Sequence, residues 1–423
     1  MIEQKDEGVS QQERSRLQEQ KINRQPTIFM MDLWATVPYY TAYLAKALLT
    51  HGAALQVGSI TYYLDTDCFS SRDIPLDPGL MNVVGRFALP PLPRRALKLV
   101  EALINLAALA LRFAFSPPDI VHVQYLAMLR WRLPLDLWFI LFCRRRGSKL
   151  VLTVHDLLPH DTADRYKQTY AHLYRQVDAI ICHSEHVRMR LVQEFGIVAK
   201  DIYVIPHGPF FFDMAGADAT QTKQMLKIAP EQLLVLWQGI IFPYKGLDLL
   251  LSAWQKVESQ AAGATLVVVG TGSPALLEQY REQARQLTLE RVVLTLRFVS
   301  PQELVDFYRA ADVVVYPYRA ITTSGALATG LALGKTIVAS DLPVFRELLT
   351  NGENALLVDA TDAEALSRAL LAVLSDAALR ERLAAKVSLM GFGEHSWSVI
   401  ASETAGVYRE VFAGTPAVAG TNG

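Results

Sequence analysis

Two short stretches carry the residue types that bind a phosphate group at the start of a helix. Lys245 and Gly246 follow an apolar segment and open a helical one, and Ser324 and Gly325 stand at the same kind of junction. The first turn of a helix offers free backbone amides and a partial positive charge, and a lysine adds a point charge. The alternatives are a solvated lysine and a plain capping turn. Because no carboxylate lies within the four residues before Lys245, we favour phosphate binding there.

His155 is the candidate for proton transfer or for hydrogen bonding to a reacting group. It directly follows the apolar segment Lys149–Val154, with Asp156 beside it and His160 in the same loop. A histidine can donate to a hydroxyl or to a leaving oxygen near neutral pH. A structural histidine bonded to the backbone is the alternative. No His, Asp or Glu cluster has ligand spacing, so we expect neither a metal ion nor another cofactor.

The segments around these residues alternate strand and helix patterns in two successive series. The pattern predicts strands over Thr27–Met31, Leu55–Tyr63, Asp119–Gln124, Lys149–Val154, Asp178–Cys182 and Asp201–Ile205, then over Gln232–Trp237, Thr265–Val269, Val292–Phe298, Ala311–Tyr316, Thr336–Ser340 and Ala355–Val358. Such alternation is typical of α/β proteins with parallel sheets. The predicted fold class is therefore two Rossmann-like, doubly wound domains facing a central cleft, where a ligand would bind.

The alternation of strand and helix patterns is interrupted between the two series, and this interruption suggests the domain limits. We expect a disordered or loosely helical tail over residues 1–25, a first domain over 26–209 and a linker over 210–230. A second domain follows over 231–395, then a helix over 396–413 and a flexible tail over 414–423. The Gly270–Thr271–Gly272 stretch falls short of a dinucleotide-binding fingerprint, so a dehydrogenase or epimerase lacks its main support.

Composition narrows the classes of partner. Lys and Arg number 41 against 42 Asp and Glu, which gives no electrostatic case for nucleic acid. Cys68, Cys143 and Cys182 are widely spaced and odd in number, so we expect packing roles in a reducing compartment. The first 25 residues hold no apolar segment of the signal-peptide kind. These features favour a cytoplasmic protein.

Two segments of the first half could lie against a membrane surface. Arg94–Phe115 is helical in composition and apolar on most faces, but its uncharged run is too short to span a bilayer. Leu129–Arg146 joins tryptophans to arginines, and Arg144, Arg145 and Arg146 close it. A buried helix and ordinary arginine caps at helix ends are the alternatives.

Several motifs in order resemble the family 4 glycosyltransferases, which adopt the two-domain GT-B fold. The resemblance covers Ile28–Val411 and rests on TVHDLLPH, HSEHVRMRLVQEFGI, VIPHG, YKGLDLLL, VVVGTGS, ADVVVYPY, SGALATGLALGKTIVASDLP and NALLVDATD. It implies retaining transfer of a sugar from a nucleotide donor without a metal ion. It also implies a donor on the second domain, an acceptor on the first, and a terminal helix that crosses back.

The resemblance assigns expected roles to individual residues. Lys245 would hold the donor diphosphate, and the amides of Ser324 and Gly325 would meet that diphosphate or the donor sugar. His155 would contact the transferred sugar. Backbone near Gly270 and Val299 would line the base pocket. A departing diphosphate gains charge in the transition state, and fixed positive groups stabilise that gain.

The chain departs from the family pattern at three positions. The family commonly carries two glutamates in a Glu-x7-Glu motif, and Ile321 and Thr329 stand at those positions. An arginine often stands five residues before the lysine, and Ile240 stands there instead. Some members resembling this chain also lack the glutamates, so their absence does not imply a loss of activity.

We therefore expect a glycosyltransferase that acts on a lipid-linked or saccharide acceptor in cell-surface polysaccharide or glycolipid synthesis, peripheral at the inner face of the cell membrane. The alternative, motivated by the missing carboxylates, is a catalytically inactive partner subunit of a glycosyltransferase complex.

Overall fold

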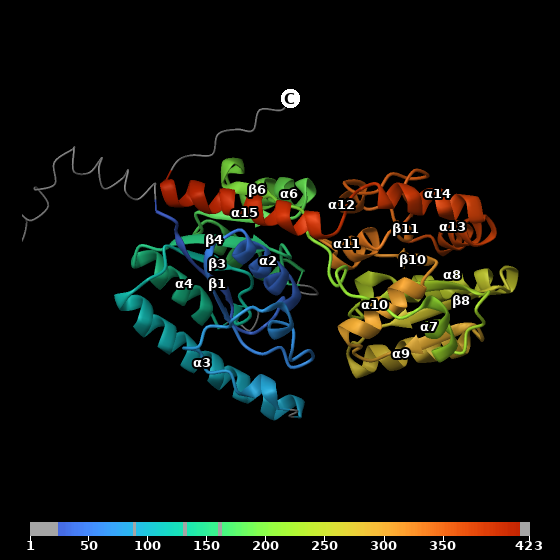
Figure 1. The fold of residues 1–423 in the computed structure, drawn as a ribbon, viewed down its shortest axis with the longest axis horizontal. Coiled ribbons are helices and arrows are strands. Elements are labelled where there is room, and N and C mark those ends of the chain that lie inside the picture. The colour runs from blue at the N-terminus through green and yellow to red at the C-terminus, as the bar shows by residue number, and fades with distance from the viewer. Residues whose placement is uncertain (1–23, 88–89, 130–132, 160–162, 415–423) are drawn as a thin grey trace, which may run out of the picture. The chain divides into compact units, whose positions relative to one another are not determined.

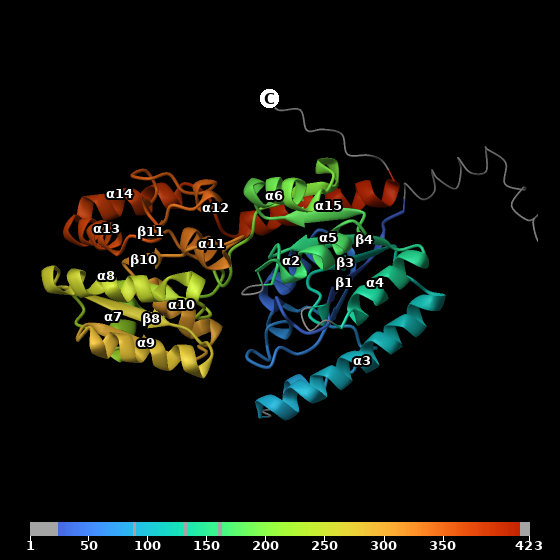
Figure 2. The same cartoon turned by 180° about the vertical axis from the view of Figure 1, so that it is seen from behind.

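A computed structural model describes residues 24–87, 90–129, 133–159 and 163–414 (Figure 1). The chain divides into two compact units. The first holds residues 1–182, 190–205 and 401–423, and the second holds residues 183–189 and 206–400. Figure 2 shows both from behind, each with strands in the middle and helices around them.

The first unit is built on a six-stranded sheet in the order β2-β1-β3-β4-β5-β6, and every adjacent pair is parallel. Its strands are β1 (Thr27–Asp32), β2 (Ala54–Ser59), β3 (Ile120–Val123), β4 (Lys149–Val154), β5 (Ala179–Cys182) and β6 (Ile202–Val204). The main helices are α2 (Pro38–Thr50), α3 (Pro91–Phe115), α4 (Leu135–Arg145), α5 (Lys167–Tyr174) and the part of α6 (Glu185–Phe195) from Arg190 onward. Strands β3 and β5 are buried along their whole length and β4 is buried beyond Lys149, because helices cover both faces of a parallel sheet.

The second unit repeats this architecture with the order β12-β11-β10-β7-β8-β9, again parallel throughout. Its strands are β7 (Leu233–Gln238), β8 (Ala264–Val269), β9 (Val292–Thr295), β10 (Val313–Tyr316), β11 (Thr336–Ser340) and β12 (Leu356–Val358). Its helices are α7 (Ala219–Met225), α8 (Leu247–Gln260), α9 (Pro274–Gln286), α10 (Pro301–Ala310), α11 (Gly325–Ala332), α12 (Pro343–Arg346), α13 (Ala363–Ser375) and α14 (Ala377–Ser388). Apolar clusters pack on the two faces of this sheet, as the predicted fold class requires.

Helix α15 (Glu394–Ala413) begins in the second unit and ends in the first. The indole of Trp397 donates to the Pro209 carbonyl oxygen at 2.7 Å, within the second unit. Further along α15, Glu410 accepts a hydrogen bond from the Tyr203 hydroxyl at 2.8 Å, within the first unit. The predicted return of the terminal helix to the first domain is confirmed.

Two predicted strands are too long because local hydrogen bonds end them early. The strand expected over Leu55–Tyr63 stops at Ser59, since the Thr61 amide donates to the side chain of Asn82. The strand expected over Val292–Phe298 stops at Thr295, where the Arg297 amide turns back to the Thr295 carbonyl.

The sequence pattern did not predict helices α4, α7 and the short α12. Helix α4 lies in the mixed apolar and basic segment 129–146, and α7 lies in the stretch expected to be a linker. Helix α7 packs on α10, and the Ala217 amide donates to Asp306 of that helix. Residues 1–23 of the predicted N-terminal tail and the last nine residues fall outside the described part of the chain. All three cysteines are buried, in keeping with packing roles.

Candidate active site

The residues predicted to bind a donor all follow neighbouring strands at one edge of the second sheet. Strands β10, β7, β8 and β9 are adjacent in that order. Ser324 and Gly325 come after β10, Lys245 after β7, Gly270 after β8 and Val299 after β9. Because the strands are parallel, their carboxyl ends meet at the same edge, where ligands bind in sheets of this kind.

Backbone geometry fixes the position of Lys245. The next residue, Gly246, has φ +64°, and a Cβ there would lie 1.8 Å from the Pro317 carbonyl oxygen. The Lys245 ammonium lies over Gly239, 2.6 Å from where a Cβ would stand, and 5.4 Å from the centre of the Tyr318 ring. Glycines at 239 and 246 therefore let the lysine lie flat against the strand ends.

Gly270 also lies where two backbone segments of this edge come close together. A Cβ on Gly270 would lie 1.9 Å from the Gly239 carbonyl oxygen, so the backbones that follow β7 and β8 nearly touch. Val299 is buried in the core between β9 and α10, just before the capping box of Ser300 and Glu303 that starts α10. Only backbone groups of Gly270 and Val299 are suited to line a pocket.

Arg319 ties the lysine loop to the segment after β10. Its guanidinium makes two hydrogen bonds to the Asp248 carboxylate, at 2.8 and 2.7 Å, and one to the Pro243 carbonyl at 2.9 Å. Its amide donates to the Tyr244 carbonyl at 2.7 Å. Such a bidentate pair holds a defined geometry. Sequence analysis missed Arg319, although an arginine just past a predicted strand was a signal available for it.

Ser324 caps α11, since its hydroxyl accepts from the Leu327 amide at 3.1 Å. Gly325 opens that helix beneath aromatic rings. A Cβ on Gly325 would lie 2.7 Å from the Phe210 ring and 2.9 Å from the His207 ring. Burial, reinforced by His183, lowers the pKa of His207 to about 3, so its imidazole is neutral.

A buried tyrosine network holds the first turn of α11 in place. The hydroxyls of Tyr308 and Tyr316 both donate to the Ala326 carbonyl, at 3.0 and 2.8 Å. The Gln238 side chain donates to Tyr308 at 2.7 Å. A Cβ on Gly330 would lie 2.4 Å from the Tyr316 hydroxyl, so only glycine leaves room for this contact.

Ile321 and Thr329, where the resemblance led us to expect glutamates, serve the packing of the chain. Thr329 is buried, accepts from the Phe210 amide at 3.0 Å and donates to the Gly325 carbonyl at 2.9 Å. Ile321 packs against the core. Glu347 accepts from the amides of Glu185 and His186, both at 2.9 Å, and so caps α6. Ile240, in the place of the frequent arginine, is 54% exposed.

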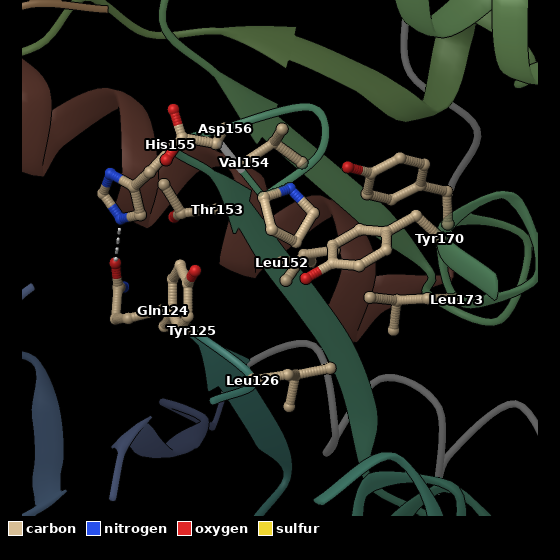
Figure 3. A pocket seen from close by; sticks show the side chains of 12 residues that line it. Gln124, Tyr125, Leu126, Leu152, Thr153, Val154, His155, Asp156, Tyr170 and Leu173 are labelled. Atoms are coloured by element: carbon tan, nitrogen blue, oxygen red, sulfur yellow. Dashed lines mark hydrogen bonds between the residues drawn. The ribbon is translucent and has the colours of Figure 1, made fainter. Parts of the chain in front are cut away.

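His155 follows β4 at the edge of a small pocket in the first unit (Figure 3). It is buried, and its ring packs edge-on against Tyr40 with centroids 4.7 Å apart. Figure 3 shows the imidazole turned toward Gln124, whose Oε1 lies 3.3 Å from Nε2. Asp156 lines the same pocket, and His160 lies outside the described residues.

Gln124 links His155 to a buried histidine and to α15. The Gln124 amide nitrogen lies 3.2 Å from Nε2 of His122, and that nitrogen is 2.7 Å from the Thr153 hydroxyl. The other ring nitrogen of His122 lies 2.6 Å from the Tyr408 hydroxyl of α15. Burial lowers the pKa of His122 to about 3, which keeps its ring neutral. Sequence analysis missed Gln124, whose polar side chain directly after a buried strand was the signal.

The three arginines expected at a membrane or acceptor surface are exposed at the end of α4. Arg144 donates to the Gln176 carbonyl at 2.7 Å and Arg146 to the Ala114 carbonyl at 2.5 Å, so both satisfy backbone groups. Arg130, Trp131 and Arg132 lie outside the described residues. Within those residues, no helix has the length and apolarity to cross a membrane, and no group of three His, Cys, Asp or Glu side chains could hold a metal ion.

Two family profiles match the chain, one on each half. Residues 37–208 match the profile described as Glycosyltransferase Family 4, and residues 218–388 match the profile described as Glycosyl transferases group 1. Between them they include His155, Lys245, Gly270, Val299 and the Ser324–Gly325 turn.

Relatives that are similar to this chain in sequence are named as glycosyltransferases or mannosyltransferases. The chain is 27% identical over 319 residues to a D-inositol 3-phosphate glycosyltransferase of Xylanimonas cellulosilytica, covering 71% of this chain and 73% of the relative. It is 32% identical over 173 residues to a phosphatidyl-myo-inositol mannosyltransferase of Mycolicibacterium smegmatis, which covers 40% of this chain and 42% of that protein.

Solved structures share the fold across nearly the whole chain. The sucrose-phosphate synthase of Thermosynechococcus elongatus superposes with a TM-score of 0.70 at 20% identity, covering 93% of this chain and all of that one. Anabaena Alr3699/HepE in complex with UDP and glucose superposes with a TM-score of 0.68 at 17% identity, covering 90% of this chain and 99% of the other. Identities this low establish the GT-B fold alone.

Proposed function

Since the chain belongs to the family 4 and group 1 glycosyltransferases of GT-B fold and is an enzyme that transfers a sugar from a nucleotide-sugar donor, we propose that it does so with retention of anomeric configuration. We propose further that its acceptor is a lipid-linked or saccharide molecule of cell-surface polysaccharide or glycolipid synthesis. Names of relatives that act on phosphatidyl-myo-inositol and on inositol 3-phosphate support a polar or lipid-borne alcohol as the acceptor.

One observation carries the donor half of this proposal. Lys245 and the amino end of α11 follow the adjacent strands β7 and β10, and Arg319 bonds the two loops together. A point charge and a helix terminus on one edge suit a diphosphate. In the proposed mechanism the Lys245 ammonium and the Ser324 and Gly325 amides stabilise the charge that the leaving diphosphate gains.

The backbone carries more of the donor contact than is usual in the family. Thr329 already bonds the main chain and Ile321 packs on the core, so neither is suited to hold a ribose. The close backbones at Gly239 and Gly270 offer peptide groups at the same edge. We therefore assign nucleotide recognition to peptide groups around Gly270 and Val299.

His155 contributes the polar group of the first unit. Gln124 can accept through its Oε1 from Nε2 of His155, which would fix the ring against Tyr40 and set its tautomer. In the proposal His155 contacts the transferred sugar near the reacting carbon and the acceptor binds to the first unit.

A panel of nucleotide sugars tests the function. Purified protein is screened by thermal shift, since a ligand that binds only the folded state raises the unfolding midpoint. Hits are incubated with saccharide and polyprenyl-linked acceptors, and NMR of the product reports the anomeric configuration. An inverted product would exclude the retaining assignment. Transfer only to acceptors outside these two classes would exclude the acceptor assignment.

A further inference from the structure

Helix α3 is unusual because part of its protein-facing side is polar. It runs over 25 residues, which is about 37 Å at the α-helical rise. Its buried face holds Ala102, Leu106, Leu109 and Phe113, and also Glu101 and Asn105. Phe113 packs edge-on against Phe29 of β1 with ring centroids 5.1 Å apart. The inner face of α3 therefore packs against the sheet.

The two buried polar residues set the rotation of the helix. One carboxylate oxygen of Glu101 accepts from the amides of Val83 and Val84, at 2.6 and 3.1 Å. Four residues on, the Asn105 side chain accepts from the Met81 amide at 2.7 Å and donates to its carbonyl at 2.9 Å. Turning the helix to bury its outer side would break all four hydrogen bonds, so the outer side stays exposed.

That outer side is apolar over its whole length. Its large side chains recur at helical spacing and are exposed by 40–84%: Leu92, Leu97, Val100, Leu103, Ile104, Leu111 and Phe115. The exposed positions between Ile104 and Leu111 are alanines, 107 and 108. Figures 1 and 2 show α3 at the border of its unit, with no described element of that unit outside it. A continuous apolar stripe of this length is typical of an interaction surface.

Positive charge flanks the stripe at both ends. Near the amino end Arg95 is exposed and Arg94 stacks on the Tyr63 ring, whereas Arg112 in the last turn pairs with the buried carboxylate of Asp77. The end of α4 adds Arg145 beside Arg146, whose contact with the Ala114 carbonyl brings that end to the end of α3. The one carboxylate of α3, Glu101, faces inward and is buried. The exposed charges beside the apolar stripe, Arg95 of α3 and Arg145 at the end of α4, are therefore positive.

We propose that the outer face of α3 lies in the plane of a bilayer that contains anionic lipids. The apolar stripe enters the boundary between headgroups and acyl chains, and the arginines at its ends meet phosphate groups. This inference deepens the proposed function, since it rests on a lipid-linked acceptor and names the surface from which that acceptor is reached.

A second copy of the chain fits this face less well. In a two-fold pair the same patch meets itself, so the cationic ends of one α3 would face cationic ends of the other whichever way the helices run. Like charges facing each other oppose association. Anionic headgroups complement the same pattern.

Vesicle flotation without any nucleotide sugar tests the proposal. We expect the protein to float with phosphatidylcholine vesicles that contain phosphatidylglycerol, and to float less as salt rises. The double variant Ile104→Gln, Leu111→Gln should lower the partition coefficient by about tenfold or more, because two exposed aliphatic side chains no longer enter the bilayer. The matched control is Met225→Gln, Leu389→Gln, which changes two exposed apolar residues of the second unit and should bind like the unchanged protein.

Two double variants that each remove two positive charges measure the electrostatic contribution to vesicle binding. Arg95→Gln, Arg145→Gln should weaken binding to anionic vesicles by about tenfold. Lys46→Gln, Lys386→Gln removes two other exposed cations and should have little effect. Equal flotation of the α3 variant and its control would overturn the proposal. So would a dimer in solution that Ile104→Gln, Leu111→Gln dissociates.

Failure here is distinguishable from failure of the proposed function. Donor binding is measured with nucleoside diphosphates in solution and needs no vesicle. Vesicle binding with no donor binding would overturn the function and leave the docking face, and the reverse result would overturn the docking face alone.

Discussion

At the scale of single residues, Lys245 is expected to dominate donor affinity. Lys245→Ala removes the point charge but leaves Gly239 and Gly246, which shape the loop. We expect the dissociation constant of the donor nucleotide to rise about tenfold or more, since a hydrogen bond to a charged group contributes about 1.5–3 kcal/mol. Calorimetric titration measures it. Lys386→Ala, an exposed lysine of α14, is the control, and equal affinities would remove Lys245 from the site.

His155 should affect turnover more than binding. If it contacts the transferred sugar, His155→Ala lowers kcat by about a hundredfold or more and changes donor affinity little. Steady-state kinetics with the donor at saturation separate the two quantities. A variant with full kcat would return His155 to a structural role.

Gln124 should act through His155. Its Oε1 lies 3.3 Å from Nε2 of His155, and its amide nitrogen lies 3.2 Å from Nε2 of His122, which also bonds the Thr153 hydroxyl. We expect Gln124→Ala to lower kcat about tenfold by releasing the ring, and to add nothing further when His155 is already alanine. A double-mutant cycle measures this coupling. Additive losses in the double variant would mean that Gln124 acts independently of His155.

At the scale of elements, the Arg319–Asp248 pair is expected to align two loops. Both side chains are partly exposed, so Arg319→Ala should change the free energy of unfolding by only about 0–1 kcal/mol. Donor affinity should nevertheless fall several-fold, because the lysine loop is no longer held to the segment after β10. Arg285→Ala removes an exposed ion pair on α9 and is the matched control. A loss of stability in proportion to the loss of affinity would contradict an aligning role.

The packing of α11 gives a stability prediction at the same scale. Gly330→Ala places a Cβ 2.4 Å from the Tyr316 hydroxyl, and the clash should lower the free energy of unfolding by about 1–3 kcal/mol. At Gly263 nothing lies within 4 Å of the added Cβ, so Gly263→Ala should change stability little. Urea titration compares the two. Similar stabilities would mean that the tyrosine network does not restrain α11.

The sequence predicts an element well when residues next to each other in the chain mark its ends. The strands at 149–154 and 336–340 appear with the predicted ends, because apolar runs mark them. Helix α4 was missed because Trp138, Phe139, Ile140 and Phe142 hide any helical period. Arg319, Gln124 and the tyrosine network depend on contacts between distant segments, which no local pattern records.

At the scale of the whole molecule, the order of motifs predicted the two-domain fold correctly. The fold does not set the site chemistry, which depends on side chains at the strand ends. The alternative of an inactive subunit arose from the missing carboxylates at 321 and 329. Family membership of both halves shows an enzyme, and the residues at those two positions instead support the core and the start of α11.

The most direct test of this description combines donor binding with turnover in one protein. Purified enzyme and its Lys245→Ala variant are titrated with uridine and guanosine diphosphate sugars, and sugar transfer is followed by mass spectrometry. The prediction is that the unchanged protein binds at least one donor and transfers its sugar, and that the variant loses donor affinity by about tenfold or more. Transfer by both proteins with the same donor affinity would contradict the placement of the donor at Lys245 and the start of α11.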